Sequence, residues 1–160
     1  MQRVMIIGCA GVGKSTLARQ LAERLQLPLH HLDRLFWRPG WVPTPKAAWI
    51  QIQEGLVAGE RWLIDGNYDS TLDLRLARAD TVIFLDLPRW RSLWGVTKRF
   101  FQYRGRSRPD LDPGCPEQVD WEFYKWIWRF KHADRPRMVA KLKALPPEVK
   151  VIWLHSRRDV

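Results

Sequence analysis

Short runs of aliphatic residues alternate along this chain with segments in which apolar residues recur every three or four positions. The apolar runs lie at 3–7, 29–32, 61–65, 81–86 and 149–154, and they are typical of strands buried on both faces. Helical spacing recurs at 15–25, 44–58, 90–101, 121–130 and 137–145. Strands that alternate with helices predict a three-layer α/β fold with about five parallel strands flanked by helices.

The positions of proline and glycine indicate where these elements begin and end. Thr44 followed by Pro45 predicts a helix start, with the hydroxyl as cap and the proline at the first helical position. The stretch 104–117, rich in Gly, Pro, Arg and Asp, predicts a flexible excursion on one domain and not a linker between two. A length of 160 residues without internal repeats fits a single domain, 1–160.

A glycine-rich segment joins the first predicted strand to the first predicted helix. It matches G-x-x-x-x-G-K-[ST], the Walker A pattern, whose backbone N–H groups cradle phosphates at the start of a helix. The expected ATP-binding residues are Gly8, Cys9, Ala10, Gly11, Val12, Gly13, Lys14, Ser15 and Thr16. Lys14 is expected to reach the β and γ phosphates, and the Ser15 hydroxyl to bind Mg²⁺. No N/T-K-x-D guanine pattern is present, so a small kinase is favoured over a GTPase.

Two carboxylates at strand ends are candidates for a second magnesium anchor. We favour Asp65, because Gly66 follows it and opens the backbone beside a nucleotide, over Asp86, which Pro88 soon follows. The alternative for Asp65 is a carboxylate that caps the loop after its strand. This choice makes Asp65 the expected metal ligand beside Ser15.

The phosphoryl acceptor is expected near the ends of the second and third strands. Asp33 is placed at the end of the second strand, where it could accept the proton of an attacking hydroxyl, although pairing with Arg34 is the competing interpretation. Asn67, Tyr68 and Arg75 follow Asp65 and are expected to hold the acceptor. No feature of the sequence identifies that small molecule or nucleotide.

The net charge of +10 comes from basic residues concentrated in two segments of the chain. Residues 88–108 contain seven Lys or Arg and no acid, whereas 124–143 contain seven Lys or Arg and one acid. A cationic lid at about 98–118 would close on a transferred phosphate, and its candidate catalytic arginines are Arg99, Arg104, Arg106 and Arg108. Charged helix faces in water are the alternative reading of the same residues.

Basic residues and ten tryptophans also fit a nucleotide-regulated nucleic-acid-binding protein, which is the alternative function. Most of the tryptophans are expected in the core. No apolar run approaches the roughly 20 residues that cross a bilayer, and two cysteines, Cys9 and Cys115, fit a reducing compartment. We therefore expect a cytoplasmic protein without a membrane partner, either monomeric or homodimeric.

Several segments are more distinctive than these patterns: VMIIGCAGVGKSTLA, HLDRLFWRPGW, the GNY at 66–68, and RGR-x-RPD-x-x-PGCPE at 104–117. Nearly end to end, they resemble a family of bacterial DNA topology modulation proteins, itself similar to the adenylate-kinase-like P-loop kinases. The resemblance implies a nucleotide at 8–16, a lid between the fourth and fifth strands, and an effect on DNA. It also implies a closing helix after the last strand, which leaves room for a trimmed carboxyl terminus.

By the same resemblance, Asp65 matches the acid of the D-G-x-P-R segment of nucleotide kinases, and Arg99 lies where their lid starts. Asp33 lies where shikimate-kinase-like relatives keep an acid near the acceptor hydroxyl. This chain lacks the proline and arginine of the D-G-x-P-R segment. The resemblance therefore leaves the acceptor open.

Overall fold

The chain folds around a parallel sheet whose strands follow the order β2-β5-β1-β6-β7. The computed structural model describes residues 1–111, 113–156 and 159. The strands are β1 (Arg3–Gly8), β2 (Leu29–His31), β5 (Trp62–Asp65), β6 (Thr81–Leu85) and β7 (Lys150–Leu154). The predicted five-stranded parallel sheet is confirmed.

The register of the central strands brings their carboxyl ends to one edge. Ile6 of β1 pairs with Asp65 of β5, and Gly8 of β1 pairs with Leu85 of β6. Every residue of β5 and β6 is buried, which explains why these strands are continuous apolar runs without alternation. Ligand sites of open parallel sheets lie beyond this edge.

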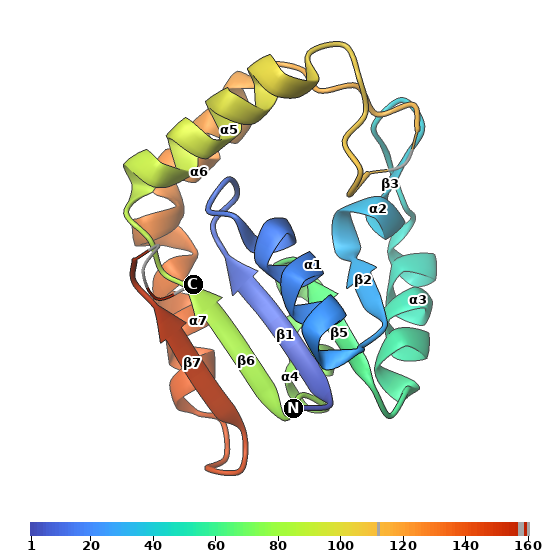
Figure 1. Ribbon diagram of the computed structural model, residues 1–160, viewed down its shortest axis with the longest axis vertical. Coiled ribbons are helices and arrows are strands. Elements are labelled where there is room, and N and C mark those ends of the chain that lie inside the picture. Colours follow the sequence, from blue (N-terminus) through green and yellow to red (C-terminus); the bar gives the residue numbers. More distant parts are fainter. Residues whose placement is uncertain (112, 157–158, 160) are drawn as a thin grey trace.

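Helices flank the sheet on both faces. In Figure 1, α1 lies in front of the strands, whereas α4 and α7 lie behind them, and α5 and α6 run side by side beyond the carboxyl edge. The helices are α1 (Lys14–Leu25), α2 (Leu32–Phe36), α3 (Lys46–Ala58), α4 (Leu72–Leu76), α5 (Arg89–Tyr103), α6 (Trp121–Ala133) and α7 (Arg135–Lys143). This arrangement confirms the three-layer α/β fold.

The glycine-rich loop after β1 touches the backbone of α5. A Cβ atom on Gly95 would lie 1.9 Å from the carbonyl oxygen of Gly11, and a Cβ on Gly11 would lie 2.3 Å from the carbonyl oxygen of Ser92. Neither position has room for a side chain, and Gly11 also has a φ of +77°. Two glycines therefore let α5 lie directly over the loop, as Figure 1 shows.

Several short elements were not predicted, and they correct two expectations. A hairpin of β3 (Trp37–Arg38) and β4 (Val42–Pro43) and a 3₁₀ turn, η1 (Asp69–Thr71), join the longer elements. Asp33 lies on α2 and not at the end of a strand, because β2 ends at His31. The capping role of Thr44 is wrong: α3 begins at Lys46, and the Thr44 hydroxyl donates to the Phe36 carbonyl at 2.9 Å.

The tryptophans are less buried than expected. Trp49 and Trp62 are in the core, and the others that the structure describes are half-buried or exposed. Four of them, together with Phe101, are more than half exposed on α5 and α6: Trp90, Trp94, Trp121 and Trp128. The expectation that most rings fill the core is therefore wrong. In the part of the chain that the structure describes, no helix has the length and apolarity to cross a membrane.

Asp80 ties the amino ends of the strands together. Its carboxylate accepts hydrogen bonds from the backbone N–H groups of Gln2 (2.7 Å) and Arg3 (2.9 Å) and from the Thr81 hydroxyl (2.8 Å). Burial alone would raise the pKa of Asp80, but these hydrogen bonds outweigh it and hold the pKa below its ordinary value of 3.8. The ionised carboxylate therefore stabilises the folded state.

We predict that Asp80→Asn lowers the free energy of unfolding by about 1–2 kcal/mol at neutral pH, because the amide replaces a charged acceptor. The wild-type advantage is present above the unfolded pKa of about 3.8 and is lost as the pH falls through the lower folded value. Urea unfolding across pH 2.5–7, roughly the window in which carboxyl groups titrate, measures it. Glu148→Gln, at an exposed position between α7 and β7, is the control, and an Asp80→Asn deficit that does not shrink in acid would contradict the assignment.

The contact between the loop and α5 generates a second prediction. Gly95→Ala is expected to destabilise the fold by about 1–3 kcal/mol, the range for overpacking, because its Cβ would collide with the Gly11 carbonyl. Gly55→Ala is the matched control: it also lies in a helix, has open space around it, and should gain about 0.5–1 kcal/mol. Equal unfolding midpoints for the two variants in urea would show that the contact is not tight.

Candidate functional site

The glycine-rich loop 8–16 leaves β1 and enters α1 with its backbone curled. Gly8, Gly11 and Gly13 all have positive φ values, of 144°, 77° and 105°. Gly13 is the N-cap of α1, and no described side chain caps the first turn. The N–H groups at the start of α1 are therefore available to an anion, as the Walker A pattern predicts.

The two polar side chains that open α1 already have partners. Lys14 folds back and donates from Nζ to the Cys9 carbonyl at 2.9 Å. The Ser15 hydroxyl donates to Oδ2 of Asp110 at 3.0 Å, across 95 positions of sequence. Burial raises the pKa of the Cys9 thiol, so this residue is a small filler of the loop and not a thiolate nucleophile. Asp110 brings the excursion 104–117 onto the phosphate cradle.

The loop after β5 carries the candidate acceptor residues, and its side chains point to different partners. Asp65 Oδ2 lies 2.9 Å from His31 Nδ1, whereas Asp65 Oδ1 is buried without a hydrogen-bond partner. The Tyr68 hydroxyl donates to Asp33 Oδ1 at 2.8 Å. Burial, with the charge of Asp33 nearby, raises the pKa of Tyr68, so its hydroxyl stays protonated.

Asn67 and Arg75 hold this loop in shape. Asn67 Oδ1 accepts from the Gly8 N–H at 2.9 Å, which ties the loop to the start of the cradle. The Arg75 guanidinium is fully buried and donates to the backbone carbonyls of Gly66, Asn67 and Tyr68. Burial lowers the pKa of Arg75 to about 9. In this structure both residues therefore contact the protein's own backbone, and Arg75 is fully buried whereas Asn67 is half-buried.

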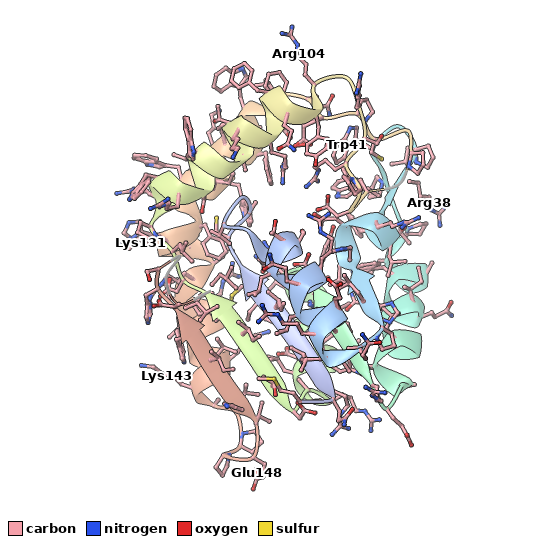
Figure 2. The ribbon with its side chains drawn as sticks, in the orientation of Figure 1. Arg38, Trp41, Arg104, Lys131, Lys143 and Glu148 are labelled. Carbon is pink, nitrogen blue, oxygen red and sulfur yellow. The ribbon has the colours of Figure 1, made fainter. Side chains whose placement is uncertain are left out.

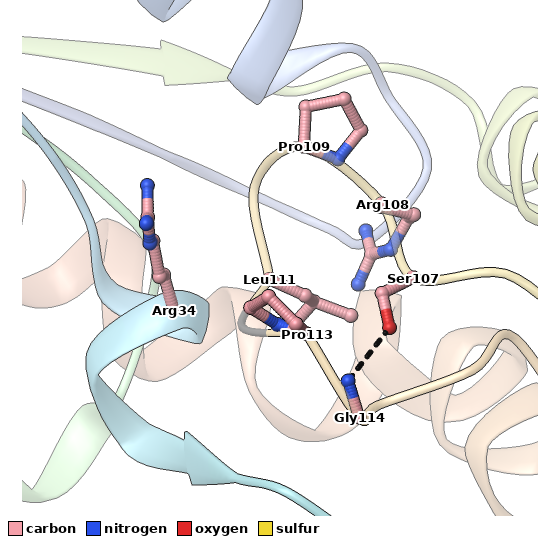
Figure 3. Close-up of a pocket in the computed structure, with 7 residues that line it drawn as sticks. All are labelled: Arg34, Ser107, Arg108, Pro109, Leu111, Pro113 and Gly114. Carbon is pink, nitrogen blue, oxygen red and sulfur yellow. Dashed lines mark hydrogen bonds between the residues drawn. The ribbon is translucent and has the colours of Figure 1, made fainter.

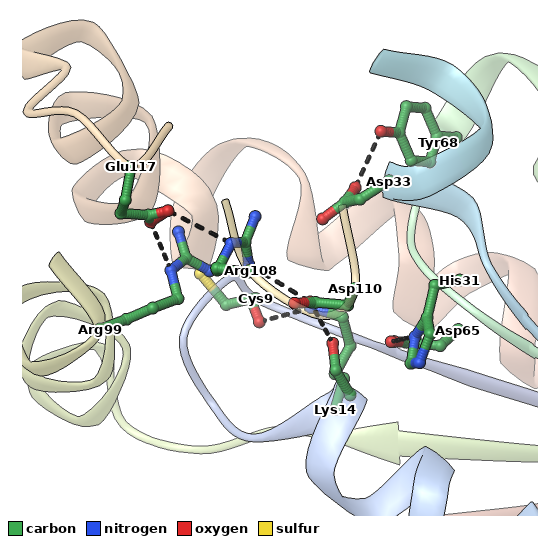
Figure 4. Close-up of polar contacts among 11 residues, drawn as sticks. Cys9, Lys14, His31, Asp33, Asp65, Tyr68, Arg99, Arg108, Asp110 and Glu117 are labelled. Atoms are coloured by element: carbon green, nitrogen blue, oxygen red, sulfur yellow. Dashed lines mark hydrogen bonds and ion pairs between the residues drawn. The ribbon is translucent and has the colours of Figure 1, made fainter. Parts of the chain in front are cut away.

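The lid contains a chain of ion pairs (Figure 4). Glu117 binds Arg99 of α5 at 2.6 Å and Arg108 at 3.2 Å, and Arg108 in turn binds Asp110 at 3.3 Å. Burial and the neighbouring Arg108 lower the pKa of Arg99. Burial alone would raise the pKa of Asp110, but Arg108 and the Ser15 hydroxyl outweigh it and lower that pKa. Arg108 is therefore linked to the start of α1 through Asp110, and Arg99 is linked to Arg108 through Glu117.

The other two predicted lid arginines are elsewhere. Arg104 and Arg106 are exposed, and Figure 2 shows Arg104 projecting away from the body of the protein. Arg104 lies 5.9 Å from the Phe100 ring centroid. Of the four arginines proposed from the sequence, the structure brings two to the cradle.

Several hydrogen bonds join described residues of the excursion to one another and to the β3–β4 hairpin. The Ser107 hydroxyl accepts from the N–H groups of Gly114 (3.2 Å) and Cys115 (3.1 Å). The Trp41 indole donates to the Pro116 carbonyl at 3.0 Å, and the Cys115 thiol donates to the Arg38 carbonyl at 3.2 Å. The β3–β4 hairpin therefore holds the lid from the side opposite α5.

A hollow of about 560 Å³ lies between α2 and the lid (Figure 3). Arg34 contributes its side chain from α2, and the lid contributes the rest of the lining: Ser107, Arg108, Pro109, Leu111, Pro113 and Gly114. The charged residues of this lining are Arg34 and Arg108, and Arg108 is also paired with Asp110 and Glu117. Asp33 precedes Arg34 on α2 and is not among the residues that line the hollow.

The residues present fit a magnesium ion only in company with phosphate oxygens. No cluster of three His, Cys, Asp or Glu that could hold a metal is found within the described ranges. Mg²⁺ characteristically takes one or two protein carboxylates and completes its shell with phosphates and water. The unpartnered buried oxygen of Asp65 and the Ser15 hydroxyl suit that role, whereas both Asp86 oxygens bind Arg135, at 2.7 and 2.6 Å. The structure therefore favours Asp65 over Asp86.

Sequence reasoning missed three residues of this site: His31, Asp110 and Glu117. His31 contacts Asp65 directly, with 2.9 Å between Nδ1 and Oδ2. Asp110 and Glu117 were visible as acids within a strongly basic segment, RGRSRPDLDPGCPE, and that contrast was the available signal. Their partners, Ser15 and Arg99, are too far away in sequence for a pattern to show.

Comparisons with known proteins agree with this geometry at the level of the fold. No family model matches the chain. The uncharacterized protein YqaC of Bacillus subtilis (strain 168) is 27% identical over 137 residues, which cover 82% of this chain and 74% of that protein. Shikimate kinase from Aquifex aeolicus superposes with a TM-score of 0.52 and 16% identity, over 96% of this chain and 86% of that one. A gluconokinase from Sinorhizobium meliloti 1021 superposes with a TM-score of 0.52 and 14% identity, over 98% of this chain and 83% of that one.

At these identities the similarity shows the fold alone. None of these three proteins carries the DNA topology modulation name, so that part of the resemblance has no support from them. What the structural matches share with this chain is a parallel sheet between helices. The chain therefore has the α/β fold of P-loop kinases, with a central five-stranded parallel sheet flanked by helices.

Proposed function

We propose that this protein is an ATP- and Mg²⁺-dependent phosphotransferase that acts on a small acceptor. The observation that carries the proposal is the curled loop 8–16 at the uncapped start of α1, with a lid of paired arginines and acids hydrogen-bonded to Ser15. A helix start with free N–H groups binds phosphate, and buried arginines stabilise charge on a transferred group. The fold shared with two kinases agrees with this function.

Each residue of the cradle has a task in such a transfer. The N–H groups of 11–15 bind the β and γ phosphates, and Lys14 exchanges the Cys9 carbonyl for a phosphate oxygen. Arg99 and Arg108 lie on the lid side, where they neutralise charge on the γ phosphate and help to exclude water. Ser15 and Asp65 would hold Mg²⁺, which neutralises phosphate charge when bound.

The acceptor side lies at α2. Asp33 has one oxygen on the Tyr68 hydroxyl and a second that could accept a proton from an attacking hydroxyl. The hollow between α2 and the lid, which has Arg34 and Arg108 in its lining, is where an anionic group of the acceptor would bind. Shikimate and gluconate, after which the two similar structures are named, are in keeping with a small hydroxylated acceptor.

We predict that Lys14→Ala weakens ATP binding about tenfold or more, because a charge-assisted hydrogen bond to phosphate is lost. Isothermal titration calorimetry with ATP and Mg²⁺ measures the affinity, and ADP release in the presence of a panel of hydroxylated acids, sugars and nucleotides measures transfer. Lys143→Ala, exposed at the end of α7, is the control and should bind normally. Unchanged ATP affinity in Lys14→Ala would overturn the proposal.

A second candidate function is supported by the outer face of α5 and α6. Trp90 and Trp94 lie about one helical turn apart on α5, and Phe101 lies about two turns further along. Each of these rings is more than half exposed. The Arg91 guanidinium lies 4.3 Å from the Trp90 ring centroid, and that of Arg89 lies 4.2 Å from the Trp128 ring. Exposed aromatic rings among arginines form the kind of surface on which proteins bind single-stranded nucleic acid.

This candidate predicts that a labelled single-stranded oligonucleotide is retained at about 50 mM salt and released as salt rises, because phosphate contacts displace counterions. Trp94→Ala should weaken binding about fivefold or more, the lower range for one lost base–aromatic stack. ATP affinity of the same variant serves as the folding control. If the wild-type protein retains no polynucleotide at low salt, this second function is excluded.

A further inference from the structure

We propose that Asp110 is a magnesium ligand carried by the lid, so that the metal joins the lid to the phosphate cradle. The proposal rests on the proposed phosphotransferase function and names a ligand that the Walker A pattern does not contain. Its starting observation is the contact between Ser15 Oγ and Asp110 Oδ2, which lie 3.0 Å apart although 95 positions separate the residues.

That separation is also the spacing of two neighbouring ligands on one ion. Mg²⁺ holds its oxygens at 2.0–2.1 Å in an octahedron, so adjacent ligands are about 2.9 Å apart. The two oxygens need no large movement to bind the same cation. Asp110 is 7% exposed, so its carboxylate is already withdrawn from water at the place where Ser15 would meet the metal.

The other carboxylates near the cradle have other tasks. Glu117 lies between Arg99 and Arg108, and one oxygen of Asp33 holds the Tyr68 hydroxyl. Asp65 contacts His31 and keeps one buried oxygen without a partner. In the described part of the chain, Asp110 is the carboxylate hydrogen-bonded to the Ser15 hydroxyl. Ser15, Asp65 and Asp110 together supply oxygen donors of the kind that magnesium prefers.

The presence or absence of a cation determines whether the Asp110 carboxylate favours or opposes nucleotide binding. Without a cation, a carboxylate at Ser15 repels the phosphates that enter the loop, so Asp110 opposes nucleotide binding. With Mg²⁺ between them, the same carboxylate becomes an attractive contact. The effect of Asp110 on nucleotide affinity therefore changes sign with the metal.

Arg108 links this contact to the rest of the lid. It binds Asp110 at 3.3 Å and Glu117 at 3.2 Å, and Glu117 binds Arg99 of α5. Figure 4 shows these side chains as one connected group above Lys14. Arg108 donates to the same Oδ2 atom that accepts from Ser15, so a cation bound to that oxygen would take the place of Arg108 and leave its guanidinium for a phosphate.

The experiment measures ADP affinity by calorimetry in excess Mg²⁺ and in EDTA, for the wild-type protein and for Asp110→Asn. The ratio of the two dissociation constants is the metal coupling. We expect Asp110→Asn to reduce this coupling about tenfold or more, within the range seen when groups that support a metal are removed. In EDTA the variant should bind ADP at least as tightly as wild type. Glu122→Gln, an exposed carboxylate at the start of α6, should leave the coupling unchanged.

A double-mutant cycle with Ser15→Ala gives an independent readout. If both residues bind one ion, the double variant should lose little more coupling than either single variant, whereas separate roles would add. Electron paramagnetic resonance of Mn²⁺ with ADP reports the same ligands directly, through the change in bound Mn²⁺ between wild type and Asp110→Asn. A matching melting temperature in the absence of ligand shows that the variant folds.

Two results would overturn the proposal while leaving the proposed function intact. If Asp110→Asn tightens ADP binding equally with and without Mg²⁺, Asp110 only blocks the empty cradle. If it changes neither affinity, the contact with Ser15 has no part in nucleotide binding. Failure of the wild-type protein to bind ADP under either condition would instead overturn the proposed function, and this inference with it.

Discussion

The close approach of the glycine-rich loop to α5 is the constraint on which the rest of the site depends. Gly11 and Gly95 bring two backbones together where no side chain fits. Because α5 is fixed there, Arg99 further along the same helix has a defined place, and it pairs with Glu117 of the lid that continues from α5. The parallel sheet adds the second constraint, since its register delivers Gly8 and Asp65 to the same edge.

The charge of the protein acquires a different meaning once it is placed in space. Within the lid, the basic residues nearest the cradle are already balanced by acids: Glu117 contacts Arg99 and Arg108, and Asp110 contacts Arg108. The lid is therefore a paired network that can exchange partners when phosphates and a cation arrive, instead of an open positive surface. On α5, by contrast, Arg89 and Arg91 contact the exposed rings of Trp128 and Trp90.

Sequence reasoning predicted the features that depend on local pattern. The five strands, the long helices and the position of the glycine-rich loop follow from apolar periodicity and glycine spacing, and the sheet is as expected. Short elements such as α2 have too few turns to show a period, so Asp33 was misplaced. Asn67 and Arg75 are predicted to hold the acceptor, and their contacts with backbone groups of Gly8 and Gly66 could not be predicted because no sequence pattern displays such partners. The contact of Asp110 with Ser15 was invisible because it depends on how the lid folds back.

The central claim is that loop 8–16 receives nucleotide phosphates while the lid closes over them. The most direct measurement is a ¹H–¹⁵N NMR titration of the wild-type protein with ATP and Mg²⁺. The account predicts large shifts at the backbone amides of Gly11, Gly13, Lys14 and Ser15, accompanied by shifts at Arg108 and Asp110 in the lid. Shifts confined to other parts of the chain, or an unchanged spectrum at saturating ATP, would contradict it.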